Sequence, residues 1–279
     1  MPQGEPAVAA WCEIEGRRYR IELAQAHDLA IALDFDGRQP RWFDAPAPRS
    51  TALASGRFSG RVELGASCNS TTLSLTPHCD GTHTECAGHL TRELLAVRTV
   101  VPPGFLPALL LSVQPTRAAQ TPEASLPLPD AADLLITRAA IGQAWPAIPL
   151  FRPRALIVRT LPNSPSKRSM DYRAHPAPYL SLAAAALMVE RGIEHLLLDV
   201  PSADRADDGG RLSAHREFFG LADGSTSLAA VRRPQCTITE LVYVDTRVAD
   251  GAYLLSLQIP ALGGDAVPSR PLLYPVRPA

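Results

Sequence analysis

Strand-like patterns of apolar and polar residues fill the first part of the chain. Residues 19–23 alternate between polar and apolar positions, and residues 29–35 form a short apolar run that ends at the turn dipeptide Asp36-Gly37. Residues 71–75, Thr-Thr-Leu-Ser-Leu, also have the composition of a strand. The pattern therefore predicts strands in all three segments.

Strands and helices alternate in the rest of the chain. Residues 130–145 have helical spacing with Asp130 as the N-cap, and the alanine-rich residues 179–191 predict a second helix that Gly192 ends. Apolar runs predict five strands, at residues 105–113, 154–161, 193–200, 236–245 and 252–260. There is no internal repeat and no linker long enough to separate two domains. The pattern predicts an α/β fold in which residues 1–279 form a single domain around one mixed sheet.

Charge and hydropathy exclude several classes of protein. The 27 Lys+Arg and 28 Asp+Glu residues leave a formal net charge of -1, whereas nucleic-acid binders and polybasic membrane anchors need a concentrated basic surface. No apolar run reaches the length of about 18–20 residues that spans a bilayer, and residues 1–10 lack the pattern of a signal peptide. The five cysteines are an odd number, so a disulfide framework is not expected. We expect a soluble, cytoplasmic protein whose cysteines are free or bound to metal.

The candidate chemistry lies in residues 78–89, His-Cys-Asp-Gly-Thr-His-Thr-Glu-Cys-Ala-Gly-His. This stretch holds His78, His83 and His89 together with a glutamate, an aspartate and two cysteines. Imidazole, thiolate and carboxylate groups are the side chains that bind transition metals in proteins. A chance cluster of polar loop residues would explain one histidine here, but not three. The segment therefore predicts a metal site.

The parity of the positions favours Cys79 over His78 as a ligand. If the segment is extended, alternate residues share a face, and Cys79 then lies on the same side as His83 and Glu85. A straight strand would hold Cys79 and His83 about 13 Å apart, since each residue adds about 3.3 Å. Both can reach one ion only if the chain bends, and Gly81 is the residue that permits a bend.

The stretch Gly81-Thr82-His83-x-Glu85-x-Ala87-x-His89 resembles the signature of the cyclase family, His-x-Gly-Thr-His-x-Asp-x-Pro-x-His, whose best-known members are the bacterial kynurenine formamidases. Residues 199–204, Asp-Val-Pro-Ser-Ala-Asp, are similar to the family's Asp-x-Pro-Ser-x-Asp element. The downstream His215 and Glu240 resemble its distant ligands, and residues 251–260 resemble its closing strand. The resemblance runs roughly from residue 70 to residue 262.

The resemblance implies a swivelling β/α/β fold, a homodimer or larger homo-oligomer, and a site for one or two divalent metal ions. Carried over by position, it makes His89 the general acid/base. The metal ligands that it implies are Cys79, His83, Glu85, His215 and Glu240. Three positions of the motif depart from the family pattern, because cysteine, glutamate and alanine stand at 79, 85 and 87 in place of histidine, aspartate and proline. A thiolate at Cys79 favours zinc, with manganese as the alternative.

The resemblance implies an arylformamidase-like hydrolase that cleaves a C–N bond of a small-molecule substrate with metal-activated water. A metal such as zinc lowers the pKa of bound water to about 7, and a neighbouring histidine can protonate the leaving amine. Two alternatives stay open on the sequence. One is a catalytically silent member of the family that binds metal, and the other is a hydrolase or cyclase that acts on a lactone-type C–O bond.

Overall fold

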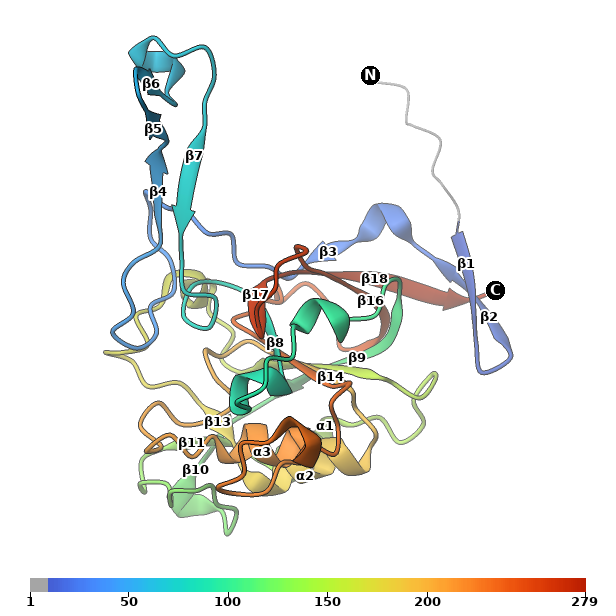
Figure 1. The fold of residues 1–279 in the computed structure, drawn as a ribbon. Coiled ribbons are helices and arrows are strands. Elements are labelled where there is room, and N and C mark those ends of the chain that lie inside the picture. Colours follow the sequence, from blue (N-terminus) through green and yellow to red (C-terminus); the bar gives the residue numbers. More distant parts are fainter. Residues whose placement is uncertain (1–9) are drawn as a thin grey trace.

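One long mixed sheet runs through residues 10–279, the part of the chain that the computed structural model describes (Figure 1). Residues 1–10, for which the sequence predicts no signal peptide, therefore lie almost wholly outside the described residues. In spatial order the strands are β1 (Ala10–Ile14), β2 (Arg17–Ile21), β18 (Arg270–Pro278), β16 (Gly251–Gln258), β9 (Leu106–Val113), β12 (Ala155–Thr160), β14 (His195–Leu198), β15 (Thr237–Glu240), β8 (His83–Cys86) and β17 (Ala266–Pro268), and β3 (His27–Asp28) also pairs with β18. Strands β9, β12, β14 and β15 are mutually parallel, and β8 joins them antiparallel.

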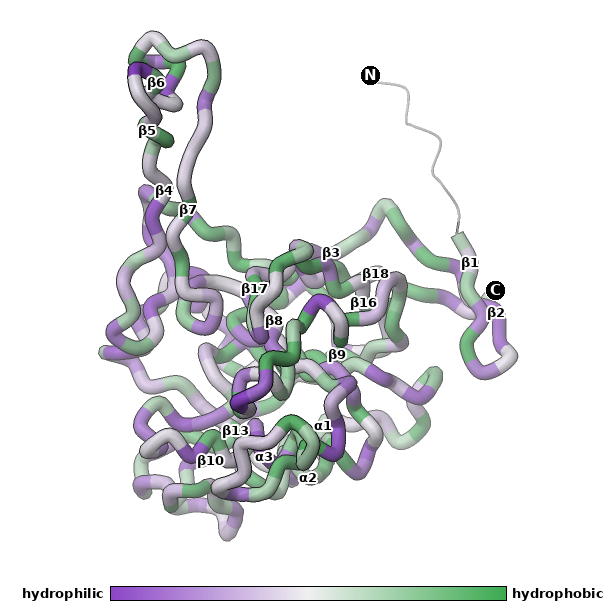
Figure 2. The backbone as a smooth tube through the Cα atoms, viewed as in Figure 1, coloured by the Kyte–Doolittle hydropathy of each residue, from purple (hydrophilic) through white to green (hydrophobic). Residues whose placement is uncertain are grey.

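Three helices cover one face of the central strands: α1 (Arg138–Ala144), α2 (Leu182–Glu190) and α3 (Ser213–Phe219). Since successive residues of a strand point to opposite faces, Leu109 and Leu111 of β9 pack in the helix-covered core, whereas Ala108 and Leu110 pack in a second core on the other face. Both α2 and β9 are hydrophobic over much of their length, as Figure 2 shows. Burial on both faces explains the continuous apolar runs of the central strands.

The remaining elements are small. Strands β10 (Thr116–Arg117), β11 (Leu134–Ile136) and β13 (Tyr179–Leu180) form a second sheet, and β4 (Arg49–Ala52) pairs with β7 (Thr71–Ser74) in an arm that projects from the body and carries β5 (Ala54–Ser55) and β6 (Phe58–Ser59) (Figure 1). Short 3-10 helices lie at Leu23–Gln25, Val62–Leu64, Ala87–Leu90, Val97–Thr99, Ala118–Gln120, Pro165–Ser169 and Leu228–Ala230. None of the helices within residues 10–279 is both long and apolar enough to cross a membrane.

The structure confirms the mixed α/β architecture and most of the predicted elements. The strands predicted at 105–113, 154–161, 193–200 and 252–260 are β9, β12, β14 and β16, and the helix predicted at 179–191 is α2, preceded by β13. Gly192 follows α2 with a φ of 72°, a left-handed conformation that suits glycine. The strand predicted at 71–75 is β7, but it lies in the arm rather than in the main sheet.

Two predictions about elements are wrong. The helix predicted over residues 130–145 begins only after Thr137, whose side chain accepts a hydrogen bond from the amide of Ala140. The residues before it form β11, which pairs with both β10 and β13, so tertiary pairing overrides the helical spacing. Residues 29–35 form no strand, and their contacts with the sheet are a hydrogen bond of 3.0 Å from the amide of Leu29 to the carbonyl oxygen of Pro271 and an isolated bridge between Ala30 and Val242.

Candidate metal centre

The register between β8 and β15 brings three buried side chains together. Glu240 of β15 lies directly opposite His83 of β8, and Glu85 shares the face of His83 because it is two residues further along the strand. The exposed fractions of His83, Glu85 and Glu240 are 0%, 1% and 3%. These three side chains therefore project from adjacent strands into the layer that contains α3.

The turn before β8 orients the His83 ring. Gly81 has a φ of 68°, and a Cβ there would lie 2.8 Å from the Leu33 side chain, so the bend requires glycine, as the sequence predicted. The Nδ1 atom of His83 lies 3.1 Å from the carbonyl oxygen of Gly81. Because a carbonyl only accepts, Nδ1 carries the proton, and Nε2 presents its lone pair 3.4 Å from Glu240 Oε2.

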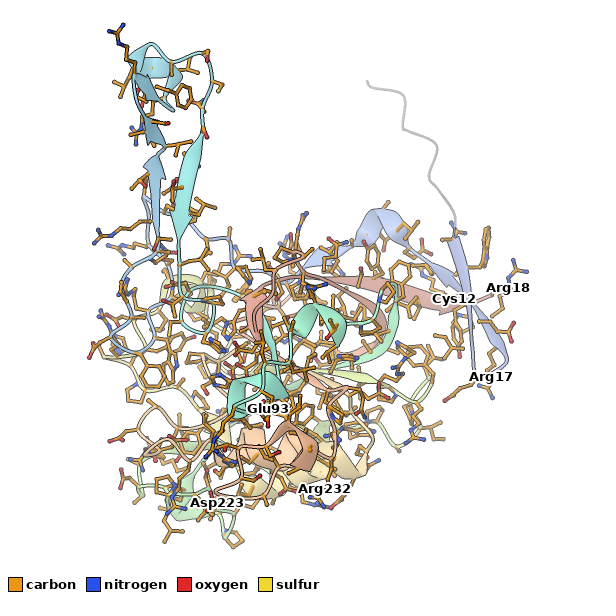
Figure 3. All side chains as sticks on the ribbon, viewed as in Figure 1. Cys12, Arg17, Arg18, Glu93, Asp223 and Arg232 are labelled. Atoms are coloured by element: carbon orange, nitrogen blue, oxygen red, sulfur yellow. The ribbon has the colours of Figure 1, made fainter. Side chains whose placement is uncertain are left out.

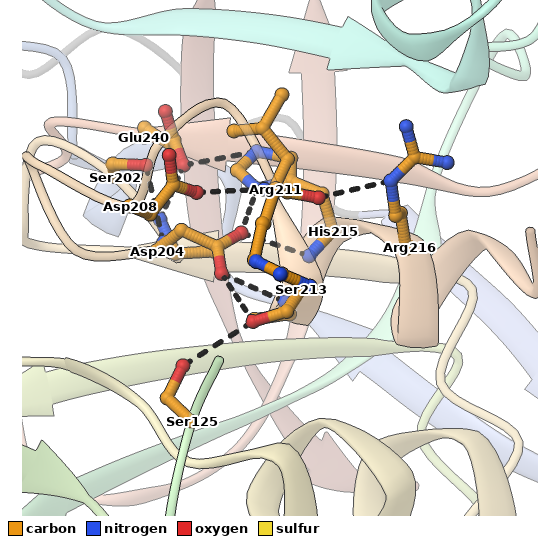
Figure 4. Close-up of polar contacts among 12 residues, drawn as sticks. Ser125, Ser202, Asp204, Asp208, Arg211, Ser213, His215, Arg216 and Glu240 are labelled. Atoms are coloured by element: carbon orange, nitrogen blue, oxygen red, sulfur yellow. Dashed lines mark hydrogen bonds and ion pairs between the residues drawn. The ribbon is translucent and has the colours of Figure 1, made fainter. Parts of the chain in front are cut away.

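Asp204 orients the His215 ring in a similar way (Figure 4). One carboxylate accepts the backbone N–H groups of Ala214 and His215 at the start of α3, and its Oδ2 lies 2.6 Å from His215 Nδ1. The Nε2 atom of His215 then lies 2.7 Å from Glu85 Oε1 and 3.5 Å from Glu240 Oε1. Sequence reasoning placed Asp204 only inside the element at 199–204, and its role as the partner of His215 emerges from the fold.

The four side chains fit a divalent cation. The Nε2 atoms of His83 and His215 and the Oε1 atom of Glu85 are buried, and none of them makes a well-directed hydrogen bond within the described residues. One donor atom each from His83, Glu85 and Glu240 lies within 4.8 Å of the other two. Buried polar atoms normally find partners, and imidazole nitrogen with carboxylate oxygen is a donor set for transition metals. A cation at this point supplies the missing partner.

Electrostatic coupling within the cluster is strong. Burial opposes the ionisation of Glu85, but its electrostatic interactions with the imidazoles of His89 and His215 outweigh burial and hold its pKa well below the usual range. Burial also opposes a charge on His215, yet Glu85 and Asp204 raise its pKa well above the usual value. Glu85 therefore stays ionised and attracts a cation, whether proton or metal.

A second group of side chains lies beside the first. His78 and His89 stack with ring centroids 4.3 Å apart, and Oδ2 of Asp265 lies 3.0 Å from His78 Nε2 and 3.6 Å from His89 Nδ1. The imidazoles of His78 and His89 hold the pKa of Asp265 well below its usual range. One atom from each of the three side chains also lies within 4.8 Å of the others, which is close enough to share an ion. No sequence motif points to Asp265, which lies far along the chain from residues 78–89.

The premise of the parity argument is wrong, because residues 75–82 form turns rather than an extended strand. As a result, His78 reaches the site, with Nε2 3.5 Å from Glu85 Oε2. Cys79 packs in an apolar cluster that includes Ile31 and Leu241, and it belongs to neither of the two donor sets. Burial, followed by the charges of Asp80 and Glu240, raises the pKa of its thiol to about 11.

The other cysteines lie outside the donor sets. Cys86 is fully buried on the opposite face of β8 and donates to the carbonyl oxygen of Leu95, as expected for a core residue. Cys12 lies on β1, at the far end of the sheet (Figure 3).

A cavity of about 510 Å³ lies next to the Asp204 side of the cluster. Asp204 and Ser202 contribute to its wall, and the amide of Ala203, between them, donates to Glu240 Oε1 at 2.6 Å. Its aromatic lining comes from Trp42, Phe43, Tyr172 and Tyr179. The cavity has the size and apolar character of a small-molecule site.

Comparison with known proteins gives one family and a set of related folds. The family model described as "Putative cyclase" matches residues 27–205, which is more than half of the chain. Solved structures with a similar fold include a predicted metal-dependent hydrolase from Bacillus stearothermophilus (TM-score 0.56, 16% identity, 90% of this chain and 98% of that chain). Isatin hydrolase A from Ralstonia solanacearum is also similar (TM-score 0.59, 17% identity, 90% and 91%), as is isatin hydrolase A from Labrenzia aggregata bound to benzyl benzoate (TM-score 0.55, 14% identity, 90% and 93%). No curated protein matches.

Proposed function

Because this chain belongs to the cyclase family, we propose that it is a metal-dependent hydrolase that cleaves the C–N bond of an amide, formamide or lactam. The observation that carries the proposal is the buried cluster of His83, Glu85, His215 and Glu240, in which three donor atoms lack a well-directed partner within the described residues. Structures with the same fold include isatin hydrolases, and isatin is a lactam.

The ligands of the metal in this proposal are the two Nε2 atoms of His83 and His215 and the carboxylates of Glu85 and Glu240. Cys79 remains a further candidate from its position in the motif, and zinc is the favoured ion. A divalent ion held there supplies a Lewis acid that polarises a carbonyl group and acidifies water. Asp204 and the Gly81 carbonyl keep the two imidazoles in the tautomer that presents Nε2 to the ion.

His89 carries the proton in this proposal. Its ring lies 5.8 Å from that of His215, at the edge of the cluster, and its side chain is 26% exposed, so it can meet both substrate and water. Water attacks the carbonyl carbon, a C–O bond forms, and one proton passes to His89. When the C–N bond breaks, His89 returns that proton to the leaving nitrogen.

The aromatic cavity favours a substrate with a flat apolar part. Trp42 and Tyr172 in its lining are both less than a tenth exposed, which makes them a fixed wall rather than a mobile surface. We expect the acyl or amine part of the substrate to lie against this wall, with its scissile bond directed to the cluster.

The test is a panel of N-formylkynurenine, isatin and simple lactones, assayed with the metal-loaded protein. Hydrolysis of an amide or lactam with no turnover of lactones supports the proposal. Turnover of lactones alone would show that the enzyme cleaves a C–O bond. Bound metal without turnover of any of these compounds would favour a catalytically silent protein that binds metal.

His83→Ala tests the placement of the metal. It removes a ligand, so we expect elemental analysis to show that most of the metal is lost. The matched control is His27→Ala, on β3 at the other end of the sheet, which should keep full occupancy. Full occupancy in His83→Ala would mean that the site is placed wrongly.

A further inference from the structure

Asp265 is held in place by the edge of the sheet. It directly precedes β17, whose residue Ala266 lies opposite Glu85 in the ladder with β8. Its carbonyl oxygen accepts a hydrogen bond of 3.1 Å from the amide of Cys86, and the carbonyl oxygen of Gly264 accepts one of 2.9 Å from Val97. The backbone on both sides of the carboxylate is thus tied to β8 and to the segment that follows it.

The turn that carries His89 approaches Asp265 closely because it contains Gly88. A Cβ at position 88 would lie 3.1 Å from the Cβ of Asp265 and 2.5 Å from the carbonyl oxygen of Leu95. The second distance is far shorter than any normal contact, so a side chain there would push the turn away. Glycine at 88 therefore sets the distance between the Asp265 carboxylate and the His89 ring.

The Asp265 carboxylate approaches the Nδ1 atom of His89. Oδ2 of Asp265 lies 3.6 Å from Nδ1 of His89, and the stacked ring of His78 limits rotation of the His89 ring. Catalytic hydrogen bonds are often long before substrate binds and shorten in the complex. A carboxylate beside Nδ1 keeps the proton of the neutral ring on that nitrogen, so that Nε2 is free to accept one.

We propose that Asp265 is the positioning residue of His89: it fixes the ring and its tautomer so that Nε2 exchanges a proton with water and with the leaving nitrogen. The inference rests on the proposed function, since that function gives His89 its task. Asp265 itself stays ionised throughout and neither gains nor loses a proton. Its role is the one that a buried aspartate has beside the histidine of a catalytic triad.

The test combines Asp265→Asn with Asp265→Glu in the zinc-loaded protein. Asp265→Asn removes the charge and offers an amide to Nδ1, so we expect kcat to fall roughly 10- to 10³-fold, within the contribution of a general acid/base, with KM and zinc content unchanged. Asp265→Glu keeps a carboxylate and should recover part of the rate. The matched control is Asp223→Asn, a 70% exposed side chain on the outside of the molecule (Figure 3), which should behave as the native protein.

Nitrogen NMR of labelled histidine gives a readout that needs no activity. We expect His89, assigned by the loss of its signals in His89→Gln, to carry its proton on Nδ1 in the native protein and less so in Asp265→Asn. An unchanged tautomer would overturn the inference. Loss of zinc from Asp265→Asn would also overturn it, and would make His78, His89 and Asp265 a second ion site. If the native protein hydrolyses nothing, the proposed function fails, and the NMR result alone decides whether Asp265 positions the ring.

Discussion

At the scale of single residues, the site depends on what occupies Nδ1 of each histidine. The Gly81 carbonyl holds Nδ1 of His83, and Asp204 holds Nδ1 of His215. In both rings Nε2 is therefore directed at a carboxylate, that of Glu240 for His83 and that of Glu85 for His215. His83 and Glu85 come from the short motif, whereas His215 and Glu240 lie far downstream of it. The groups that orient the two rings are a backbone carbonyl in a bend and a carboxylate in the loop before α3.

His89→Ala should separate catalysis from metal binding. If His89 carries the proton, kcat should fall about 10²–10⁴-fold, while elemental analysis shows the same metal content as in the native protein. His27→Ala is the control for removal of an imidazole elsewhere. Metal lost together with activity would instead make His89 a ligand.

Cys79→Ser and His78→Ala, compared by elemental analysis, test the first position of the motif. The sequence predicts zinc in the native protein, lost in Cys79→Ser and kept in His78→Ala, because a thiolate favours zinc. The geometry makes His78 the necessary comparison, since its Nε2 lies 3.5 Å from Glu85 Oε2. Zinc that survives in Cys79→Ser and disappears in His78→Ala would contradict the prediction and leave Cys79 as a packing residue.

The family resemblance predicted the four side chains of the cluster, but it did not predict Asp265 or the position of His78. His83, Glu85 and Glu240 meet because the adjacent strands β8 and β15 carry them, and His215 joins them from α3. Asp265 could not be predicted, since only the antiparallel pairing of β17 with β8 brings it within reach. His78 was assigned to the wrong face because that assignment assumed an extended chain where the protein turns.

At the scale of elements, periodicity predicts the central strands because both of their faces are buried. Periodicity fails for short segments whose structure depends on tertiary pairing. The residues of β11 have helical spacing, yet β11 pairs with β10 on one side and with β13 on the other. Periodicity fails again at residues 29–35, where Leu29 and Ile31 are buried although the segment forms no strand. Burial alone does not distinguish a strand from a covering loop.

Strand β14 carries a buried histidine that should make stability depend on pH. Burial lowers the pKa of His195 from 6.5 to about 4, and its Nδ1 lies 2.9 Å from the Thr237 hydroxyl. Below pH 6.5 the unfolded chain binds a proton that the folded protein does not, so stability is lost as the pH falls from 6.5 towards 4. Between pH 7.5 and pH 5 this loss is about 2 kcal/mol.

Urea unfolding of the native protein and of His195→Gln at both pH values, with a chelator present, measures the effect. The native protein should lose more stability than His195→Gln by about 2 kcal/mol, because all other groups are common to the two. An equal loss in both would show that His195 is not the cause.

At the scale of the whole molecule, the arm formed by β4 and β7 is a separate two-stranded sheet that projects from the body (Figure 1). A two-stranded ribbon is marginally stable alone, and this one exposes Leu53, Leu64 and Leu73. We expect the protein to be a homodimer or larger oligomer, so that sedimentation velocity gives a mass of at least twice 29.9 kDa. Leu64→Glu with Leu73→Glu should weaken association if the arm takes part. A native protein that sediments as a monomer would contradict the expectation.

The position of β17 at the end of the sheet has a consequence for hydrogen exchange. β17 is three residues long and covers the outer side of β8, while β15 covers the inner side. Edge elements open at a lower free energy than central ones, so deuterium should enter the amides of β17 before those of β15. Each such opening carries Asp265 away from His89 but leaves Glu240 paired beside His83. If the two proposals hold, we expect the native ensemble to include a form that keeps the proposed metal ligands together but separates His89 from Asp265.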